Sequence, residues 1–207
     1  ALMDAYGLSL REHLNYGRET KRKRSFGGLA AAAVLSDLSK KDALESNIHF
    51  KFPSPRPCEF AENNIVHGRL YRCARDWQKF PTLISLHGGG DFLNYRYRFP
   101  LTVPAIHRPG FNAATLVAPY HFQRSVHRIE AFDHLRISEA FGQGVAEIRA
   151  LTGWLLDQGC PSIALFGISL GGWLAGLTAT RDSRLKAIVL AVPGVRREYR
   201  GTRGERV

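Results

Sequence analysis

The stretch LFGISLGGWLAG, residues 165–176, places one serine, Ser169, between two glycines and directly after an apolar run. The apolar run at 162–166 predicts a short buried strand, and the residues from 170–180 predict a helix. The order glycine, any residue, serine, any residue, glycine matches the pattern in which a serine sits on a sharp strand-to-helix turn. Ser169 is therefore a candidate nucleophile, although a serine hydroxyl needs a base to react. Taken alone, the pattern also fits a glycine-rich turn with an incidental serine.

A second glycine-rich stretch, HGGG at residues 87–90, ends an earlier apolar strand predicted at 81–87. A glycine-rich loop at the carboxyl end of a strand leaves backbone N–H groups free to face a developing oxyanion. The stretch lacks both the G-x-G-x-x-G pattern and the Lys-Ser/Thr pair of phosphate-binding loops. The two motifs together predict an acyl-transfer site. Its candidate oxyanion donors are the backbone N–H groups of Leu170, Gly88, Gly89 and Gly90.

The rest of the pattern alternates strands with helices. Further strands are predicted at 65–72, 113–120 and 185–192, and a long helix is predicted at 138–159. Gly159 is a candidate C-cap of that helix, and the proline that follows two residues later prevents its continuation. Strands that alternate with helices form a mostly parallel sheet through right-handed crossovers. The predicted fold class is therefore α/β, with helices flanking the sheet.

The pattern divides the chain into three parts. Residues 1–58 form a weakly patterned N-terminal extension that ends in a proline-rich connector. Residues 59–195 form the α/β core. Residues 196–207 form a basic tail with neither strand nor helix periodicity, which is expected to be disordered or frameshifted.

The amino-acid composition limits the classes of function that the protein can have. The 207 residues are 44% hydrophobic and 23% charged, which suits one globular domain, and no apolar run is long enough to span a membrane. The net charge is +11, but segment 139–192 is neutral and no nucleic-acid-binding motif is present, so a nucleic-acid partner is not expected. Three cysteines, odd in number and far apart, match neither a metal site nor a disulfide framework. They favour a reducing compartment such as the cytoplasm.

The segments SLHGGG and FGISLGG, with the strands and helices between them, resemble the α/β-hydrolase superfamily over about residues 60–195. Three segments, LHGGGDFLNYRYRFP, LVAPYHFQRS and FGISLGG, are similar to those of an uncharacterised bacterial branch of α/β-hydrolase-domain proteins. The resemblance implies hydrolysis of an ester, thioester or amide of a small acyl substrate through an acyl-enzyme on Ser169. It implies no metal and no organic cofactor. For His87 it implies a structural role, in which the imidazole hydrogen-bonds the backbone that holds the glycines.

The resemblance also exposes a gap, because such hydrolases carry the triad in the order serine, acid, histidine. After Ser169 the chain has the acids Asp182, Glu198 and Glu205 but no histidine. Asp182 is expected at the surface, at the sheet end opposite Ser169, and Glu198 in a solvated loop. Among the eight histidines, His121 follows a predicted strand at the same sheet end as Ser169, which makes it the candidate substitute base.

Three explanations of the missing base remain open. The chain can be a fragment or frameshifted product of a longer hydrolase whose C-terminal part of the fold holds the acid and the histidine, and this is the expectation that the arginine-rich end favours. It can instead be a non-catalytic relative that binds a ligand or regulates a partner at the site that is catalytic in active hydrolases. The third explanation is an unusual base, with His121 first.

Overall fold

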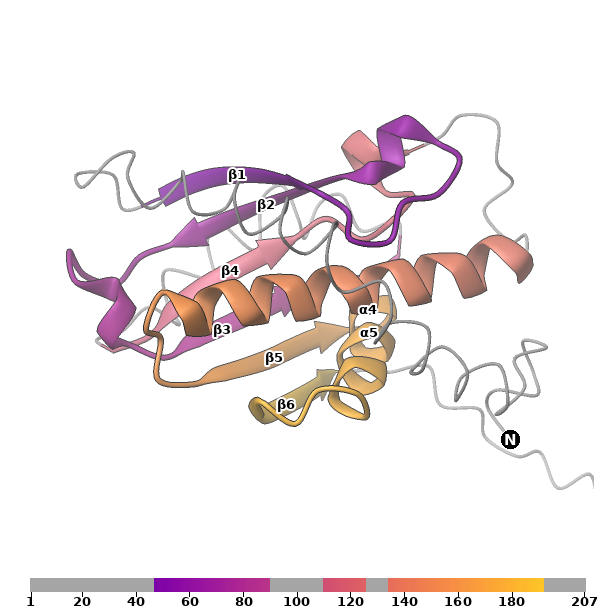
Figure 1. Cartoon of the computed structure of the whole chain (residues 1–207). Coiled ribbons are helices and arrows are strands. Elements are labelled where there is room, and N and C mark those ends of the chain that lie inside the picture. Colours follow the sequence, from indigo (N-terminus) through magenta and orange to yellow (C-terminus); the bar gives the residue numbers. More distant parts are fainter. Residues whose placement is uncertain (1–46, 90–109, 126–133, 192–207) are drawn as a thin grey trace, which may run out of the picture.

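The computed structural model describes residues 47–89, 110–125 and 134–191, and these residues build one sheet covered by two α-helices (Figure 1). Short 3₁₀ turns occur at Ala61–Asn64, Trp77–Lys79 and Phe122–Arg124. The six strands are β1 (Asn47–Pro53), β2 (Ile65–Tyr71), β3 (Thr82–Leu86), β4 (Asn112–Leu116), β5 (Ile163–Ile168) and β6 (Leu185–Ala191). The helices are α4 (His134–Asp157) and α5 (Leu170–Ala179).

The strands lie in the order β1-β2-β4-β3-β5-β6. The pairs β1–β2 and β2–β4 are antiparallel, while β4, β3, β5 and β6 run parallel to one another. Within the register, Leu86 at the end of β3 pairs with Leu116 on one side and with Gly167 on the other. Because parallel strands end at one edge of a sheet, the residues that follow β3, β4 and β5 gather there.

The two helices lie on the same side of the sheet, with the long α4 crossing in front of the central strands and α5 beside β5 and β6 (Figure 1). The core lies between helices and sheet, because the apolar stripe of α4 meets the alternate side chains of the parallel strands. Its fully buried members include Ile84, Ala114, Ile163, Leu165, Ile148, Leu151, Leu155 and Ala175.

The strands and helices predicted for the described residues are confirmed with small shifts of their ends. The helix α4 begins four residues earlier than the predicted 138, and Gly159 beyond its end has a φ of 106°, as a glycine C-cap requires. The strand β1 was not predicted, and it lies within the stretch assigned to the N-terminal extension. Its alternation of buried Phe50 and Phe52 with exposed neighbours is short and runs directly into the proline-rich connector, which hides it.

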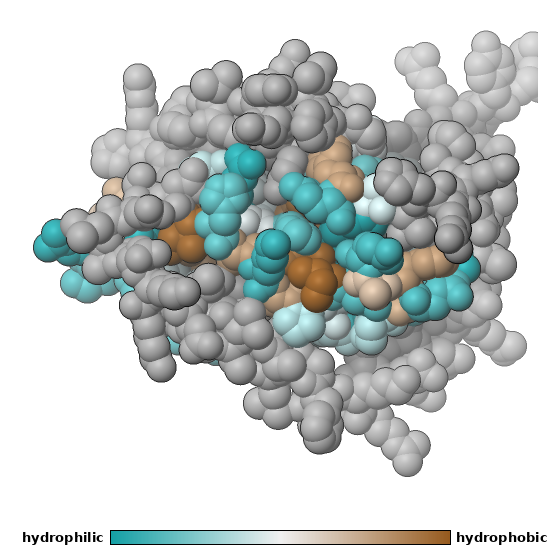
Figure 2. Space-filling view, turned by 90° about the horizontal axis from the view of Figure 1, so that it is seen from above, coloured by the Kyte–Doolittle hydropathy of each residue, from teal (hydrophilic) through white to brown (hydrophobic). Residues whose placement is uncertain are grey.

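Most of the N-terminal extension and the basic tail at 196–207 lie outside the described residues. On the face seen from above β1, hydrophilic and hydrophobic residues are interspersed, without a continuous apolar patch among the coloured residues (Figure 2). Within the part of the chain that the structure describes, no helix combines the length and the apolar character needed to cross a membrane.

Candidate active site

Ser169 occupies the junction between β5 and α5. Its backbone is left-handed, with φ 50° and ψ −113°, and it is the N-cap of α5. The N–H of Ser169 donates to the carbonyl of Ala191 at 2.9 Å, and its own carbonyl accepts from the N–H of Trp173 at 3.1 Å. A non-glycine residue in such a conformation costs about 1–3 kcal/mol, which the surrounding structure must offset. The turn leaves the serine side chain exposed at the edge of the sheet.

The turn requires its two glycines, Gly167 and Gly171, because neighbouring backbone leaves no room for a side chain at either position. A Cβ at Gly167 would lie 2.1 Å from the carbonyl oxygen of Gly171, and a Cβ at Gly171 would lie 2.3 Å from the carbonyl oxygen of Leu86. Any side chain at either position would therefore collide with backbone. The second contact also shows that the first turn of α5 rests on the end of β3, so the serine turn and the start of the HGGG stretch touch.

His87 is buried at the start of that stretch, 1% exposed. The backbone N–H of Ala118 donates to its Nε2 at 2.9 Å, so Nε2 is an acceptor and the ring proton is on Nδ1. Nδ1 then donates to the carbonyl of Gly88 at 2.7 Å. The imidazole thus connects the loop after β3 to the end of β4. Gly88 is buried and Gly89 is exposed, while Gly90 lies outside the described residues.

His121 lies next to these groups, in the loop that follows β4. Its Nδ1 is 2.8 Å from the carbonyl of Pro119. Its Nε2 and the side chain of Leu170 each lie 3.9 Å from the position that a Cβ of Gly89 would take. Burial lowers the pKa of His121 below its usual 6.5; the hydrogen bond to Pro119 opposes this shift, and the charge of Arg124 adds to it. The ring is therefore neutral near neutral pH.

Among the residues that the structure describes, no base is joined to Ser169 through a hydrogen bond. The Ser169 side chain makes no capping bond with α5, and none of the side chains in the described ranges, His121 included, is hydrogen-bonded to its hydroxyl. His121 lies beside the glycine loop, as its contact with the Cβ position of Gly89 shows.

The expectation that Asp182 is a surface residue is wrong. Asp182 lies between α5 and β6, at the sheet end away from Ser169, but it is only 5% exposed. It accepts hydrogen bonds from the Arg184 side chain at 2.6 and 2.7 Å and pairs with Arg149 at 3.6 Å. Burial alone would raise the pKa of Asp182, but the hydrogen bonds from Arg184 and the two arginine charges hold it below its usual value. The contacts with Arg184 and Arg149 therefore explain how a charged carboxylate can be buried at this position. Glu198 and Glu205 lie outside the described residues.

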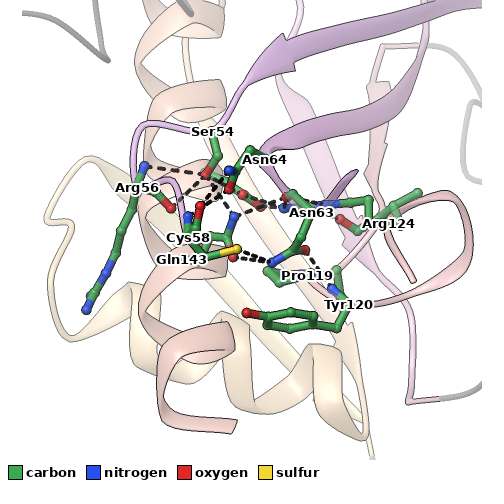
Figure 3. A network of polar contacts seen from close by, with 12 residues as sticks. Ser54, Arg56, Cys58, Asn63, Asn64, Pro119, Tyr120, Arg124 and Gln143 are labelled. Carbon is green, nitrogen blue, oxygen red and sulfur yellow. Dashed lines mark hydrogen bonds and ion pairs between the residues drawn. The ribbon is translucent and has the colours of Figure 1, made fainter. Parts of the chain in front are cut away.

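A buried polar network, which was not predicted, supports the loop that carries His121 (Figure 3). Its centre is Asn63, which is fully buried. The Asn63 Oδ1 accepts a hydrogen bond from the N–H of Tyr120 at 2.8 Å, and its Nδ2 donates to Oε1 of Gln143 at 2.7 Å. The Asn63 carbonyl accepts from Nε and one terminal nitrogen of Arg124, at 3.1 and 2.5 Å.

Arg124 and Glu147 form an ion pair inside this network. Arg124 is fully buried, and its terminal nitrogens lie 2.7 and 2.8 Å from the two carboxylate oxygens of Glu147. Arg124 also donates to the carbonyl of Val117 at 2.8 Å, and Ser54 donates to Glu147 at 2.6 Å. The pair therefore ties the loop after β4 to α4 and to the connector after β1. One signal was visible in the sequence: Glu147 is an acid on the apolar stripe of a predicted helix.

The network holds a strained backbone. Tyr120 and Phe122, on either side of His121, have φ values of 62° and 50°. Together with Ser169 they are the three non-glycine residues with positive φ in the described part of the chain. Bulky residues rarely adopt this conformation, and such outliers cluster at functional sites.

The mixed sheet, the left-handed serine between a parallel strand and a helix, and the glycine-rich loop beside it together define an α/β hydrolase fold. The family model described as alpha/beta hydrolase domain containing 18 matches residues 33–194. This chain belongs to that family.

Solved structures agree on the fold. The esterase Pf2001 of Pyrococcus furiosus is similar with a TM-score of 0.51 and 16% identity, over 76% of this chain and 53% of the esterase. A cold-adapted esterase from an Arctic intertidal metagenomic library is similar with a TM-score of 0.50 and 18% identity, over 69% of this chain and 59% of that protein. The chain thus spans little more than half the length of these proteins. No curated protein matches it.

Proposed function

We propose that the protein of this chain is a serine hydrolase that cleaves an ester, thioester or amide bond of a small acyl substrate through an acyl-enzyme on Ser169. The observation that carries the proposal is the left-handed backbone of Ser169, held at the β5–α5 junction directly against the end of β3. A strained, exposed serine beside a glycine-rich loop is the arrangement of a nucleophile next to an oxyanion site.

In the proposed reaction the Ser169 hydroxyl attacks the substrate carbonyl and gives its proton to a base. The carbonyl oxygen becomes an oxyanion and accepts hydrogen bonds from the N–H of Leu170 and from the loop that contains Gly88, Gly89 and Gly90. The Leu170 N–H is the first of α5, so it has no acceptor within the helix. Each aligned donor stabilises the transition state by about 3 kcal/mol. Collapse of the intermediate breaks the bond to the alcohol, thiol or amine, which leaves with the proton that the base returns. Water then gives a proton to the same base and attacks the acyl-enzyme, and the bond to Ser169 breaks to release the acid and restore the serine hydroxyl.

The structure around His87 supports a holding role for this residue in the same scheme. Its two ring nitrogens bond Gly88 and Ala118, so neither is available to the serine. His87 therefore orients the backbone of the glycine loop and takes no part in proton transfer. Within the described residues, the candidate acceptor of the serine proton is His121.

One observation favours a second candidate function, a binding or regulatory module that keeps the fold without turnover. Within residues 47–89, 110–125 and 134–191, nothing hydrogen-bonds the Ser169 hydroxyl and activates it. The two candidates differ in one property, the reactivity of Ser169 towards an electrophile.

A fluorophosphonate probe separates the two candidates. We expect the probe to label the chain at Ser169, with Ser169→Ala abolishing labelling as read by intact mass and peptide mapping. Ser183→Ala, at an exposed serine beyond α5, is the matched control and keeps wild-type labelling. A chain that stays unlabelled while it melts cooperatively would contradict an activated Ser169 in this chain, as expected for the binding module or for a longer hydrolase whose further part supplies the base.

A further inference from the structure

The peptide that joins Val117 to Ala118, directly beyond the end of β4, is hydrogen-bonded on both sides. Its carbonyl oxygen, that of Val117, accepts a hydrogen bond from Nη1 of Arg124 at 2.8 Å. Its N–H, that of Ala118, donates to Nε2 of His87 at 2.9 Å. The carbonyl oxygen and the amide hydrogen of a trans peptide point in opposite directions. Arg124 therefore holds the peptide from one side and His87 from the other.

The peptide that joins Gly88 to Gly89 repeats this arrangement. Its carbonyl oxygen, that of Gly88, accepts a hydrogen bond from Nδ1 of the buried His87 at 2.7 Å. The N–H of Gly89 belongs to the same trans peptide, so it points away from His87, and Gly89 itself is exposed. Within the described residues, no acceptor is bonded to this N–H. Leu170 is its neighbour, with its Cβ 3.9 Å from the position that a Cβ of Gly89 would take.

These bonds form one continuous relay, in which Arg124, the first peptide, His87 and the second peptide each donate to the next. Its direction is fixed at the buried end, because a guanidinium can only donate. His87 continues the relay only as a neutral ring with its proton on Nδ1. Hydrogen bonds in such a chain polarise one another, and a charged first donor strengthens the effect. Arg124, Val117 and His87 are at most 1% exposed, so the relay reaches the surface at Gly89.

Glu147 and Asn63 fix Arg124 at the start of the relay. The Nη1 that donates to Val117 also donates to one carboxylate oxygen of Glu147 at 2.8 Å, and Nη2 donates to the other at 2.7 Å. The Asn63 carbonyl accepts two further bonds from the guanidinium (Figure 3). A buried ion pair is a weak source of net stability, because desolvation of the two charges offsets their attraction. This pair also gives the Val117 carbonyl a charged donor in a fixed position.

We propose that Arg124 is a positioning residue of the candidate active site, which acts through His87 to orient and polarise the N–H of Gly89. The inference rests on the proposed function, because the oxyanion of that mechanism is the acceptor that this N–H would meet. Arg124 is fully buried and acts through two peptides and one imidazole, so it does not touch the reacting atoms. The buried ion pair and the glycine loop are then two ends of one device.

The first measurement needs no variant with altered packing. The chain is labelled with ¹⁵N-histidine, and the ring nitrogens of His87 are observed by NMR between about pH 5.5 and about pH 7.5, where an ordinary histidine changes its charge. The spectrum of His87→Asn identifies the His87 signals by their absence. We expect Nδ1 to be protonated and Nε2 to be unprotonated throughout. A proton on Nε2, or on both nitrogens, would reverse a link of the relay and overturn the inference.

The second measurement removes the charged donor. In the double variant Arg124→Met with Glu147→Leu, we expect the ¹⁵N resonance of the Gly89 amide to move upfield, because a peptide nitrogen responds to hydrogen bonding at its own carbonyl. Fluorophosphonate labelling of Ser169 should slow at least about tenfold, less than the loss of a whole oxyanion donor. Arg149→Met, on α4 but outside the relay, is the matched control and keeps both values. An unmoved Gly89 resonance in a cooperatively melting double variant overturns the inference.

A double-mutant cycle with His87→Asn separates the relay from a general effect of charge or packing. Asparagine can still donate to the Gly88 carbonyl but offers no acceptor to the N–H of Ala118, so it interrupts the relay in the middle. We expect the change at Arg124 and Glu147 to have no further effect on Gly89 in this background. An equal effect in both backgrounds would show that Arg124 acts without His87 and would reject the relay.

The two readouts also separate this inference from the proposed function. A Gly89 resonance that moves through His87, with unchanged labelling of Ser169, rejects the positioning role of Arg124 and leaves the hydrolase standing. A wild-type chain that is not labelled, but whose Gly89 resonance depends on Arg124 through His87, counts against an activated serine in this chain. The orientation of the Gly89 N–H by Arg124 then still stands.

Discussion

At the scale of single residues, the glycines of the site differ in how much room a side chain would have at each position. Gly167 and Gly171 face backbone at less than van der Waals distance, so their lack of a side chain is a condition of folding. A Cβ on Gly89 would meet the Nε2 of His121 and the side chain of Leu170 at 3.9 Å, which is ordinary contact, so packing does not require glycine at this position. The same residue type therefore has a structural task inside the serine turn and, in the proposed mechanism, a chemical task in the loop beside it.

Two alanine variants separate these tasks. Gly171→Ala pushes Cβ into the carbonyl of Leu86, and we expect it to lower the free energy of unfolding by about 1–3 kcal/mol or more, as overpacking does. Gly89→Ala meets its neighbours at ordinary distance, so its melting temperature stays at the wild-type value. Its labelling by the fluorophosphonate falls at least tenfold, because the methyl lies between His121 and Leu170, beside the proposed oxyanion donors, and hinders the approach of the reacting group. Urea unfolding and labelling rates measure both effects; a stable, fully reactive Gly89→Ala chain would contradict the site assignment.

His121 also makes stability depend on pH. Its pKa in the folded chain lies below 6.5, so between the two values the unfolded chain binds the proton more readily. Stability therefore falls as the pH drops through this window. We expect the decrease in unfolding free energy between about pH 7.5 and about pH 5.5 to be smaller in His121→Phe than in wild type. His67, whose pKa is lowered mainly by burial, leaves a residual slope in the variant. Equal slopes in both proteins would contradict a depressed pKa at His121.

At the scale of elements, the loop after β4 is attached to three parts of the protein at once. Arg124 joins it to α4 through Glu147, and Asn63 joins it to the turn before β2. A polar network of this kind contributes only when every member has a partner, because an isolated buried charge is expensive. The network therefore contributes mainly by holding the backbone of Tyr120 and Phe122 in its strained conformation.

The ion pair predicts a large single-residue effect. Arg124→Met leaves the Glu147 carboxylate buried without its partner, and we expect the free energy of unfolding to fall by about 3–5 kcal/mol. The double variant Arg124→Met with Glu147→Leu removes both charges and recovers most of that loss. Urea denaturation with an unchanged m-value is the measurement. A double variant no more stable than Arg124→Met would show that the loss does not come from the uncompensated charge.

At the scale of the whole molecule, β6 is the outer strand of the described sheet, and it is apolar on its exposed surface. Ile188, Val189 and Leu190 are 39%, 54% and 40% exposed. An apolar outer strand with open N–H and C=O groups is a template for pairing with another chain. The net charge of +11 opposes such contacts through repulsion between chains.

These two features predict salt-dependent self-association through β6. Screening of the positive charge by added salt should increase the associated fraction in sedimentation velocity, because the Debye length falls to about 3 Å at 1 M. Val189→Lys should reduce association at every salt concentration, since a charge on an outer strand blocks pairing. Phe111→Lys, at a site 49% exposed but outside β6, is the control and should associate like wild type. Equal association of all three proteins would remove β6 from the contact.

Local patterns were enough to predict the parts of this protein that depend on neighbours in the chain. The apolar strand before Ser169, the two glycines around it and the helix after it lie within one short stretch, so the turn was predicted from the sequence. The HGGG stretch and the period of α4 were predicted for the same reason. The β1 strand escaped because its few alternating residues gain meaning only from pairing with β2.

Contacts between distant residues were decided only by the tertiary structure. Asn63 and Tyr120 are 57 positions apart, and Arg124 and Glu147 are 23 positions apart, so no local period connects them. The orientation of the His121 side chain also depends on distant residues. Its Nε2 faces Gly89 because the network fixes the strained turn around it. The burial of Asp182 was missed because one of its two arginine partners, Arg149, lies far away in the chain on α4, although the other, Arg184, is close by in the same turn. Burial of a polar side chain depends on partners that folding brings together, and a single sequence does not name them.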